Sequence, residues 1–288
     1  MDLSRFRQDA ERMKHVDLDY AAFRDQPLSN GALRAVRYMA DVESHTILYL
    51  RDLLVTPSHK DARVTEFLIH WAYGEYWHGE ALGEVLRMHG LPARDQRVRQ
   101  VRRAQGLKDR WMPVGQSLLA NTIGDDYVAV QMAWGAVNAW CTLAAYQRLR
   151  ALEPHPVLAQ LIERIERTAE EGGAFFGAQT RHRLERSATA RRLARFALRA
   201  AWTPVGSSIQ PRSESAFAFG YLLTGAEGIA VVEQVDRKVD RLPGLAGMHL
   251  ARRGVGGFGT GPGARRGLHL PALLRPPRPW RAWRRAVR

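Results

Sequence analysis

Four long segments of the chain place apolar side chains at alternating spacings of three and four residues, the pattern of an amphipathic helix. They cover residues 31–54, 61–89, 125–152 and 156–186. No stretch alternates in the two-residue period of a β-strand. Residues 91–124, between the second and third segments, are too long for a tight turn and leave room for a crossover. The sequence therefore predicts an all-α fold in which four helices pack as a bundle.

Polar residues interrupt these apolar stripes at four positions. Glu43 lies on the stripe of the first segment, Glu75 and His78 on that of the second, and Glu171 on that of the fourth. A buried carboxylate without a partner is costly, so these side chains need a metal ion, a counter-charge or a hydrogen-bond network. Three carboxylates and an imidazole would repel one another in a buried site without a cation. A bound cation relieves this repulsion, which favours a metal site. The alternative is a carboxylate–imidazole pair that is satisfied inside the bundle.

The residues around these positions resemble a known superfamily. The segment Glu-Tyr-Trp-His-Gly-Glu-Ala-Leu at 75–82, with Trp-Gly-Ala-Val-Asn at 134–138 and Arg-Leu-Pro-Gly-Leu at 241–245, is similar to ferritin-like di-iron carboxylate proteins. The likeness covers residues 30–186 and is greatest to the bacterial branch near the soluble acyl-carrier-protein desaturases. It implies a ferritin-like four-helix bundle with accessory C-terminal helices, in which two helices each supply a Glu and two a Glu-x-x-His. It also implies two irons, dioxygen-dependent oxidation or desaturation of acyl or other small apolar molecules, and frequent homodimers.

The chain departs from that pattern at two ligand positions. The glutamate that should follow Asn138 is Ala139, and the histidine that should follow Glu171 by three residues is Ala174. The four remaining ligands are Glu43, Glu75, His78 and Glu171. They form a full set for one metal ion and a poor set for two, so the resemblance implies one iron ion more readily than two. Manganese and zinc accept the same oxygen and imidazole ligands. Dioxygen is expected at the position that Ala139 and Ala174 leave open.

The expected function is an oxidoreductase of the di-iron carboxylate type with a degenerate second site. Its small apolar or acyl substrate should lie between the helices, near the two positions where metal ligands are missing. The residues expected to contact it are Trp71, Trp134, Asn138, Ala139 and Ala174. Aromatic side chains at helical spacing are also typical of a plain core. The alternative function is therefore a non-catalytic bundle that serves as a binding or scaffold protein.

The positive charge is concentrated at the end of the chain. Residues 251–288 hold ten arginines and no acidic residue, so only +4 of the net charge of +14 belongs to the first 250 residues. The hydrophobic pattern predicts an N-terminal helix and connector at 1–29, the bundle at 30–186 and accessory helices at 187–247, and the composition predicts a disordered Gly/Pro/Arg tail at 248–288. Such a tail suits an anionic surface, but the sequence carries no specific nucleic-acid motif.

Two further features bear on partners and location. Arg97, Arg99, Arg102 and Arg103 could receive an acidic carrier protein, although a charged run is usually a solvated face. The single cysteine, Cys141, excludes a disulfide framework and a thiolate metal cluster. The chain starts without a signal-peptide pattern and has no run of eighteen apolar residues, which predicts a cytoplasmic protein without a transmembrane segment.

Overall fold

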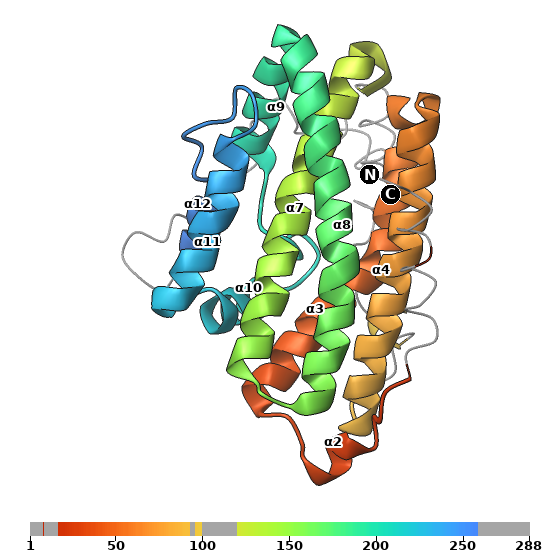
Figure 1. Ribbon diagram of the computed structural model, residues 1–288, viewed down its shortest axis with the longest axis vertical. Helices are drawn as coiled ribbons and strands as arrows, with labels where there is room; N and C mark the ends of the chain where they lie inside the picture. Colours follow the sequence, from red (N-terminus) through yellow and green to blue (C-terminus); the bar gives the residue numbers. More distant parts are fainter. Residues whose placement is uncertain (1–7, 9–16, 93–95, 100–119, 259–288) are drawn as a thin grey trace, which may run out of the picture.

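A computed structural model describes residue 8 and residues 17–92, 96–99 and 120–258. Within these ranges the chain forms helices and no strand, which confirms the all-α prediction. The four long helices are α3 (Asn30–Leu54), α4 (Ala62–Met88), α7 (Asp125–Leu152) and α8 (Pro156–Arg186). Each lies within one residue of its predicted bounds. Figure 1 shows them running along the long axis, with α3 packed on α4 and α7 packed on α8.

Side-chain caps fix the starts of α3 and α4. The Ser29 hydroxyl accepts a hydrogen bond from the Ala32 N–H at 3.2 Å, and Asp61 Oδ1 accepts from the N–H groups of Arg63 and Val64 at 3.1 Å each. Each cap contributes about 1 kcal/mol. Ser58, a residue type that often caps helices, does not cap α4. It lies in the 3-10 helix η2 (Pro57–Lys60), where its hydroxyl donates to Gln131.

A short connection and a close approach join α7 to α8. Pro156 occupies the first turn of α8, and His155 Nδ1 accepts hydrogen bonds from the N–H groups of the next two helical residues. Further along, Gly135 allows α8 to approach, because a Cβ at this position would lie 2.4 Å from the Phe176 ring. The two helices therefore form one tightly packed layer.

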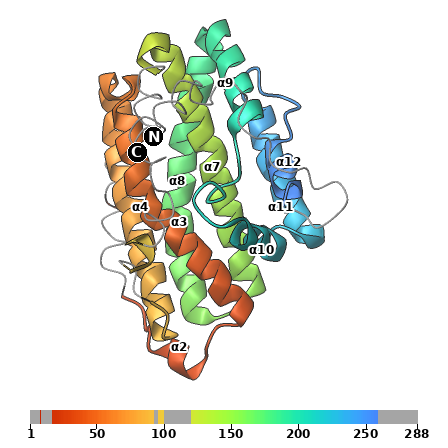
Figure 2. The ribbon, with the colours of Figure 1, turned by 180° about the vertical axis from the view of Figure 1, so that it is seen from behind.

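Further helices follow α8. They are α9 (Ala188–Ala201), α10 (Arg212–Leu222), α11 (Gly225–Asp240) and α12 (Leu250–Gly256), while a short helix, α2 (Ala22–Asp25), precedes α3. Contacts join α9 and α11 to α7, and α10 to α3. Figures 1 and 2 agree that α11 and α12 lie on the side of α7 away from α4. The C-terminal helices thus cover one flank of the long helices.

The predicted disorder does not hold for residues 248–258. Helix α12 lies there, and Leu250 and Ala251 are buried. The Asp236 carboxylate, on α11, accepts hydrogen bonds from the N–H groups of Ala251 and Arg252 at 2.8 and 3.1 Å. The composition of this segment, rich in Gly and Arg, predicted disorder. The hydrogen bonds to Asp236 and the burial of Leu250 and Ala251 order it instead. The rest of the predicted tail, 259–288, lies outside the described residues.

Arg97 does not belong to an exposed basic surface. Its side chain is buried, its Nε donates to Asp41 Oδ1 at 2.8 Å, and a second guanidinium nitrogen donates to the Pro92 carbonyl at 2.6 Å. A buried ion pair of this kind is structural, because removal of one partner leaves an uncompensated charge. Arg99 is exposed, whereas Arg102 and Arg103 lie outside the described residues.

In length and composition, α7 would be able to cross a membrane, as would α10 and α11 together across their 102° bend. In the structure, 61% of the most apolar window of α7 is buried inside the protein. Contacts with α8, α9 and α11 account for this hydrophobicity, since a helix covered on several sides needs apolar residues on all of them.

Candidate metal centre

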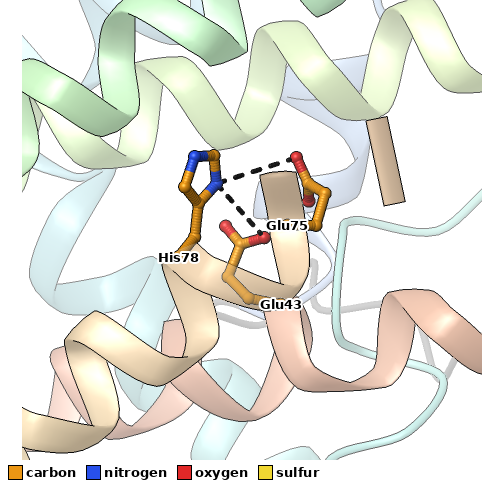
Figure 3. A group of neighbouring side chains, drawn as sticks. All are labelled: Glu43, Glu75 and His78. Carbon is orange, nitrogen blue, oxygen red and sulfur yellow. Dashed lines mark ion pairs between the residues drawn. The ribbon is translucent and has the colours of Figure 1, made fainter. Parts of the chain in front are cut away.

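Three ionisable side chains from two helices converge in the interior. Glu43 comes from α3, and Glu75 and His78 come one turn apart from α4 (Figure 3). His78 Nδ1 lies 4.0 Å from Glu43 Oε2 and 3.9 Å from Glu75 Oε1. The side chains of Glu43 and His78 are each 2% exposed and that of Glu75 is 16% exposed. The helical spacing predicted this grouping correctly for these three residues.

The close approach of α3 and α4 at Gly79 brings the three together. A Cβ at Gly79 would lie 2.8 Å from Ser44 Oγ and 3.3 Å from the Ser44 backbone nitrogen. A larger residue at this crossing would require the Ser44 side chain or one of the helices to shift. Gly79 directly follows His78, and Ser44 directly follows Glu43. The close contact between Gly79 and Ser44 therefore sets the distance between the His78 imidazole and the Glu43 carboxylate.

The distances from the imidazole to each of the two carboxylates fit a shared ion. Two ligands that each lie about 2.1 Å from one metal ion can be at most about 4.2 Å apart. Both imidazole–carboxylate distances are within that limit. Moreover, Glu43 Oε2 and His78 Nδ1 are buried without a hydrogen-bond partner. Within the described ranges, His78 is the only basic side chain at ion-pair distance from Glu43 or Glu75. The donor set therefore suits a divalent cation.

A buried tyrosine fixes the orientation of the Glu43 carboxylate. The Tyr146 hydroxyl, from α7, donates a hydrogen bond of 2.6 Å to Glu43 Oε1. This bond occupies one carboxylate oxygen and leaves Oε2 directed toward His78. Burial, followed by the negative charge of Glu43 and the hydrogen bond to it, raises the pKa of Tyr146 well above its usual value. The phenol thus stays protonated and acts as a donor.

Thr168 determines which imidazole nitrogen is available. Its hydroxyl donates its single hydrogen to the Ile165 carbonyl at 3.0 Å, and its oxygen lies 2.7 Å from His78 Nε2. Toward the imidazole this oxygen is an acceptor, so the hydrogen-bond pattern assigns the ring proton to Nε2. Nδ1 then carries the lone pair that faces the carboxylates. An imidazole fixed in this way by its other nitrogen is typical of a metal ligand.

Burial shifts the protonation of the group toward its neutral forms. The pKa of Glu75 is raised well above its usual value by burial, then by the charge of Glu43 and a hydrogen bond with it, while a hydrogen bond from Trp71 lowers it. Burial lowers the pKa of His78, against the opposing effect of the Glu43 charge. The protein therefore resists two adjacent carboxylate charges, and either a proton or a cation relieves their repulsion.

Glu171 does not join the other three predicted ligands. None of its carboxylate oxygens lies within 4.8 Å of all three donor atoms, and the residue is half-buried on α8. Thr168, one turn earlier on α8, is the residue that contacts His78. Next to Glu171, the ring of Trp71 lies 3.6 Å from the Cβ position of Gly172. The role of Glu171 as a ligand stays a prediction.

Ala139 and Ala174 do not enclose a common space. Ala174 is exposed, whereas Ala139 is half-buried beside Gly173. The ring of Trp140 packs on α8 here, 3.1 Å from the Cβ position of Gly173 and 3.0 Å from that of Gly177. The expectation that dioxygen binds at a position left open by both alanines is therefore wrong, because one faces outward and an indole fills the space between the helices.

The five predicted pocket residues lie in different places. Trp71 and Ala139 pack against the apolar cluster around Phe67 and Phe176. Trp134 packs against a different apolar cluster, which includes Ala194 and Leu198 of α9. Asn138 Oδ1 accepts a hydrogen bond of 3.0 Å from Trp202 Nε1, and Ala174 is exposed. A cavity of about 50 Å³ lies elsewhere, between α3, α7 and the C-terminal helices. Glu43 lines it, and none of the five residues does.

Three residues that build the site were not predicted as functional: Gly79, Tyr146 and Thr168. Tyr146 and Thr168 lie within the predicted helices 125–152 and 156–186, and a hydroxyl that a helix buries needs a hydrogen-bond partner. This requirement is a signal that could have connected them to Glu43 and His78. Gly79 gives the weaker signal of a glycine inside a helix, which costs about 1 kcal/mol relative to alanine and suggests close packing.

In comparisons with known proteins, no family model, curated protein or solved structure matches the chain.

Proposed function

We propose that this protein binds one divalent transition-metal ion through Glu43, Glu75 and His78, within a ferritin-like four-helix bundle. The observation that carries the proposal is the convergence of two buried donor groups and one half-buried one, whose atoms lie within 4.8 Å of one another. Two carboxylates and one imidazole match the ligand preferences of iron, manganese and zinc. Iron is the first choice because the residues around the site resemble those of di-iron carboxylate proteins.

A single ion is favoured over two. The described donors are confined to α3 and α4, while the alanines at the two missing ligand positions do not face each other. The packing of Trp140 against Gly173 and Gly177 leaves less room between α7 and α8. The remaining coordination positions of one ion would be open to Glu171 after a side-chain movement, or to water and substrate.

The reaction class we propose is the oxidation of a small apolar or acyl molecule. When bound, an iron ion would supply one-electron redox chemistry with dioxygen. The chain contributes the surroundings of that ion. Tyr146 holds the Glu43 carboxylate, Thr168 holds the His78 tautomer, and burial keeps bulk water away from the donor atoms. These contacts would hold the metal ligands in a fixed orientation and exclude water from them, as catalysis at a metal ion requires.

The second candidate is a non-catalytic bundle that binds a partner. It is favoured by the proximity of the Glu75 and Glu43 carboxylates, whose donor atoms lie within 4.8 Å of each other, and by the raised pKa of Glu75; one shared proton could then satisfy both carboxylates. In that case the group would be a buried polar network that needs no ion. Binding to an acidic carrier protein, homodimer formation, contact of the basic tail with an anionic surface and a cytoplasmic location stay predictions from the sequence.

Elemental analysis of the purified protein separates the two candidates. The protein would be produced in iron-supplemented cells beside Glu75→Ala and a matched control, Glu163→Ala, which changes an exposed glutamate on α8. The first candidate predicts about one metal ion per chain in the wild type and the control, and loss in Glu75→Ala. Oxygen consumption by the iron-loaded protein then tests the reaction class. Absence of metal from every sample, including protein reconstituted with Fe²⁺, Mn²⁺ or Zn²⁺, would establish the second candidate.

A further inference from the structure

The cavity of about 50 Å³ lies between two of the long helices, α3 and α7, and the C-terminal helices. Met39, Val42 and Glu43 line it from α3, and Cys141 and Ala145 line it from α7. Its remaining wall comes from α10, α11, α12 and the segment after α9, including Val235. Glu43 therefore belongs both to the wall of this cavity and to the candidate metal centre, whereas Glu75 and His78 do not line the cavity.

The wall offers little to a polar ligand. Glu43 is the only charged residue among the described residues that line it, and the two carboxylate oxygens of Glu43 are directed to Tyr146 and His78. The Tyr38 hydroxyl donates to the Val205 carbonyl at 2.8 Å. Burial raises the pKa of Cys141 to about 12, with a further rise from the charge of Asp236, so its thiol is neutral. A buried water requires two to four polar partners, and a cavity with such a wall favours apolar contents.

The volume restricts the contents further. Cavities of about 150 Å³ with apolar walls hold benzene or xenon. A cavity one third of that size accepts two or three heavy atoms and excludes most of an acyl chain. We propose that this cavity binds a small apolar molecule of two or three heavy atoms, the size class of dissolved gases such as dioxygen, in contact with Glu43.

This inference deepens the proposed function, because dioxygen is the oxidant which that function requires. Because Glu43 lines the cavity and belongs to the candidate metal centre, a molecule in the cavity would lie next to one of the proposed ligands. Binding in the cavity does not itself depend on a metal ion. The two proposals can therefore fail separately.

Xenon is the probe for this cavity, since it is apolar and has about the size of the proposed ligand. Methyl NMR spectra of the metal-free full-length protein would be recorded at increasing xenon pressure. The expected result is a saturable shift at the methyl groups of Val42 and Val235, with only a small linear drift at Val64, which is buried in the separate cluster around Phe67. Dioxygen pressure should broaden the same two methyl resonances through its paramagnetism.

Filling the cavity provides the decisive variant. Ala145→Leu should reduce the xenon affinity at least tenfold, and Ala178→Leu, the same change at an exposed position of α8, should leave it unchanged. Ala218→Val fills the wall from α10 if Ala145→Leu does not fold. Saturable shifts that persist in the filled variants, or no saturable shift in the wild type, would overturn the proposal. A decanol titration that shifts the same resonances at lower concentration than xenon would overturn the size class.

Metal content measured on the same preparations distinguishes the two failures. Saturable xenon binding in a protein that takes up no metal would leave this inference standing and remove the proposed function.

Discussion

The Tyr146 hydroxyl donates a 2.6 Å hydrogen bond to Oε1 of Glu43, a residue 103 positions earlier in the chain. Both side chains are fully buried, and the bond joins the pair α3–α4 to the pair α7–α8 at the level of the candidate metal centre. One oxygen of the carboxylate is thereby fixed, and the other faces His78 at 4.0 Å. The orientation of a proposed metal ligand thus depends on a residue from the opposite layer.

Tyr146→Phe tests this dependence. The variant retains the ring but removes the donor, so Glu43 Oε1 is left buried without a partner. We expect metal affinity to fall about 10- to 100-fold, the usual effect of losing an outer hydrogen bond to a ligand. The metal-free protein should lose about 1–3 kcal/mol of unfolding free energy. Metal titration and urea denaturation measure the two effects, and unchanged affinity would show that Tyr146 does not orient the carboxylate.

Thr168 is expected to act through the imidazole tautomer. Thr168→Val keeps the shape of the side chain and removes the oxygen that accepts from His78 Nε2. Metal affinity should fall about 10- to 100-fold. Thr168→Ser, which keeps the hydroxyl, should restore most of it. Nitrogen-15 NMR of the metal-free protein reads the tautomer directly: a protonated Nε2 in the wild type and a mixture in the valine variant.

The close approach at Gly79 provides a prediction about helix spacing. Gly79→Ala should destabilise the protein by about 1–3 kcal/mol, although alanine is the better helix former, because its Cβ would lie 2.8 Å from Ser44 Oγ. The same variant should weaken metal binding, since α3 and α4 carry the ligands. Ser44→Ala in the same chain removes the oxygen and should recover most of the stability in thermal denaturation. A stable Gly79→Ala protein with full metal affinity would contradict this account.

Glu75→Gln should separate stability from metal binding. A carboxyl group whose folded-state pKa is raised stabilises the metal-free protein fully below its unfolded pKa of about 4.3, and this contribution is lost as pH rises through the folded pKa. The metal-free wild type should therefore lose stability on the alkaline side, where His78 is already neutral. The neutral glutamine should remove this loss and stabilise the protein there by about 1–3 kcal/mol.

The same substitution should abolish tight metal binding, because an amide is a poor replacement for a carboxylate ligand. Denaturation of both proteins in a chelator across a pH series checks the stability effect. A parallel pH dependence in wild type and variant would mean that Glu75 is not the group responsible.

The long helices were predictable because their local signals agree with one another. The apolar stripes indicated the bounds of the four long segments, and α3, α4, α7 and α8 match them within one residue. The convergence of Glu43, Glu75 and His78 followed from the same stripes. Helical spacing fixes the face of a residue only approximately, however. This explains the outward position of Ala174 and the separation of Glu171 from the other three donors.

Features that depend on tertiary contacts were not predictable from one sequence. Helix α12 owes its start to Asp236, on another helix, and the cavity is formed only when the C-terminal helices cover α3 and α7. The burial of Arg97 depends likewise on Asp41, 56 positions away. No local pattern in residues 248–258 or 97 indicates these partners. Composition therefore gave the wrong expectation in both places.

The central claim is that Glu43, Glu75 and His78 hold one metal ion, and a Co²⁺ titration of the metal-free protein tests it most directly. The visible absorption of Co²⁺ reports its nitrogen and oxygen ligands, and its saturation point gives the number of ions per chain. We predict one tightly bound ion, accompanied by proton release because the metal displaces the Glu75 proton, and no tight binding in His78→Ala. Two equivalent ions per chain, or a saturation curve that His78→Ala leaves unchanged, would contradict the claim.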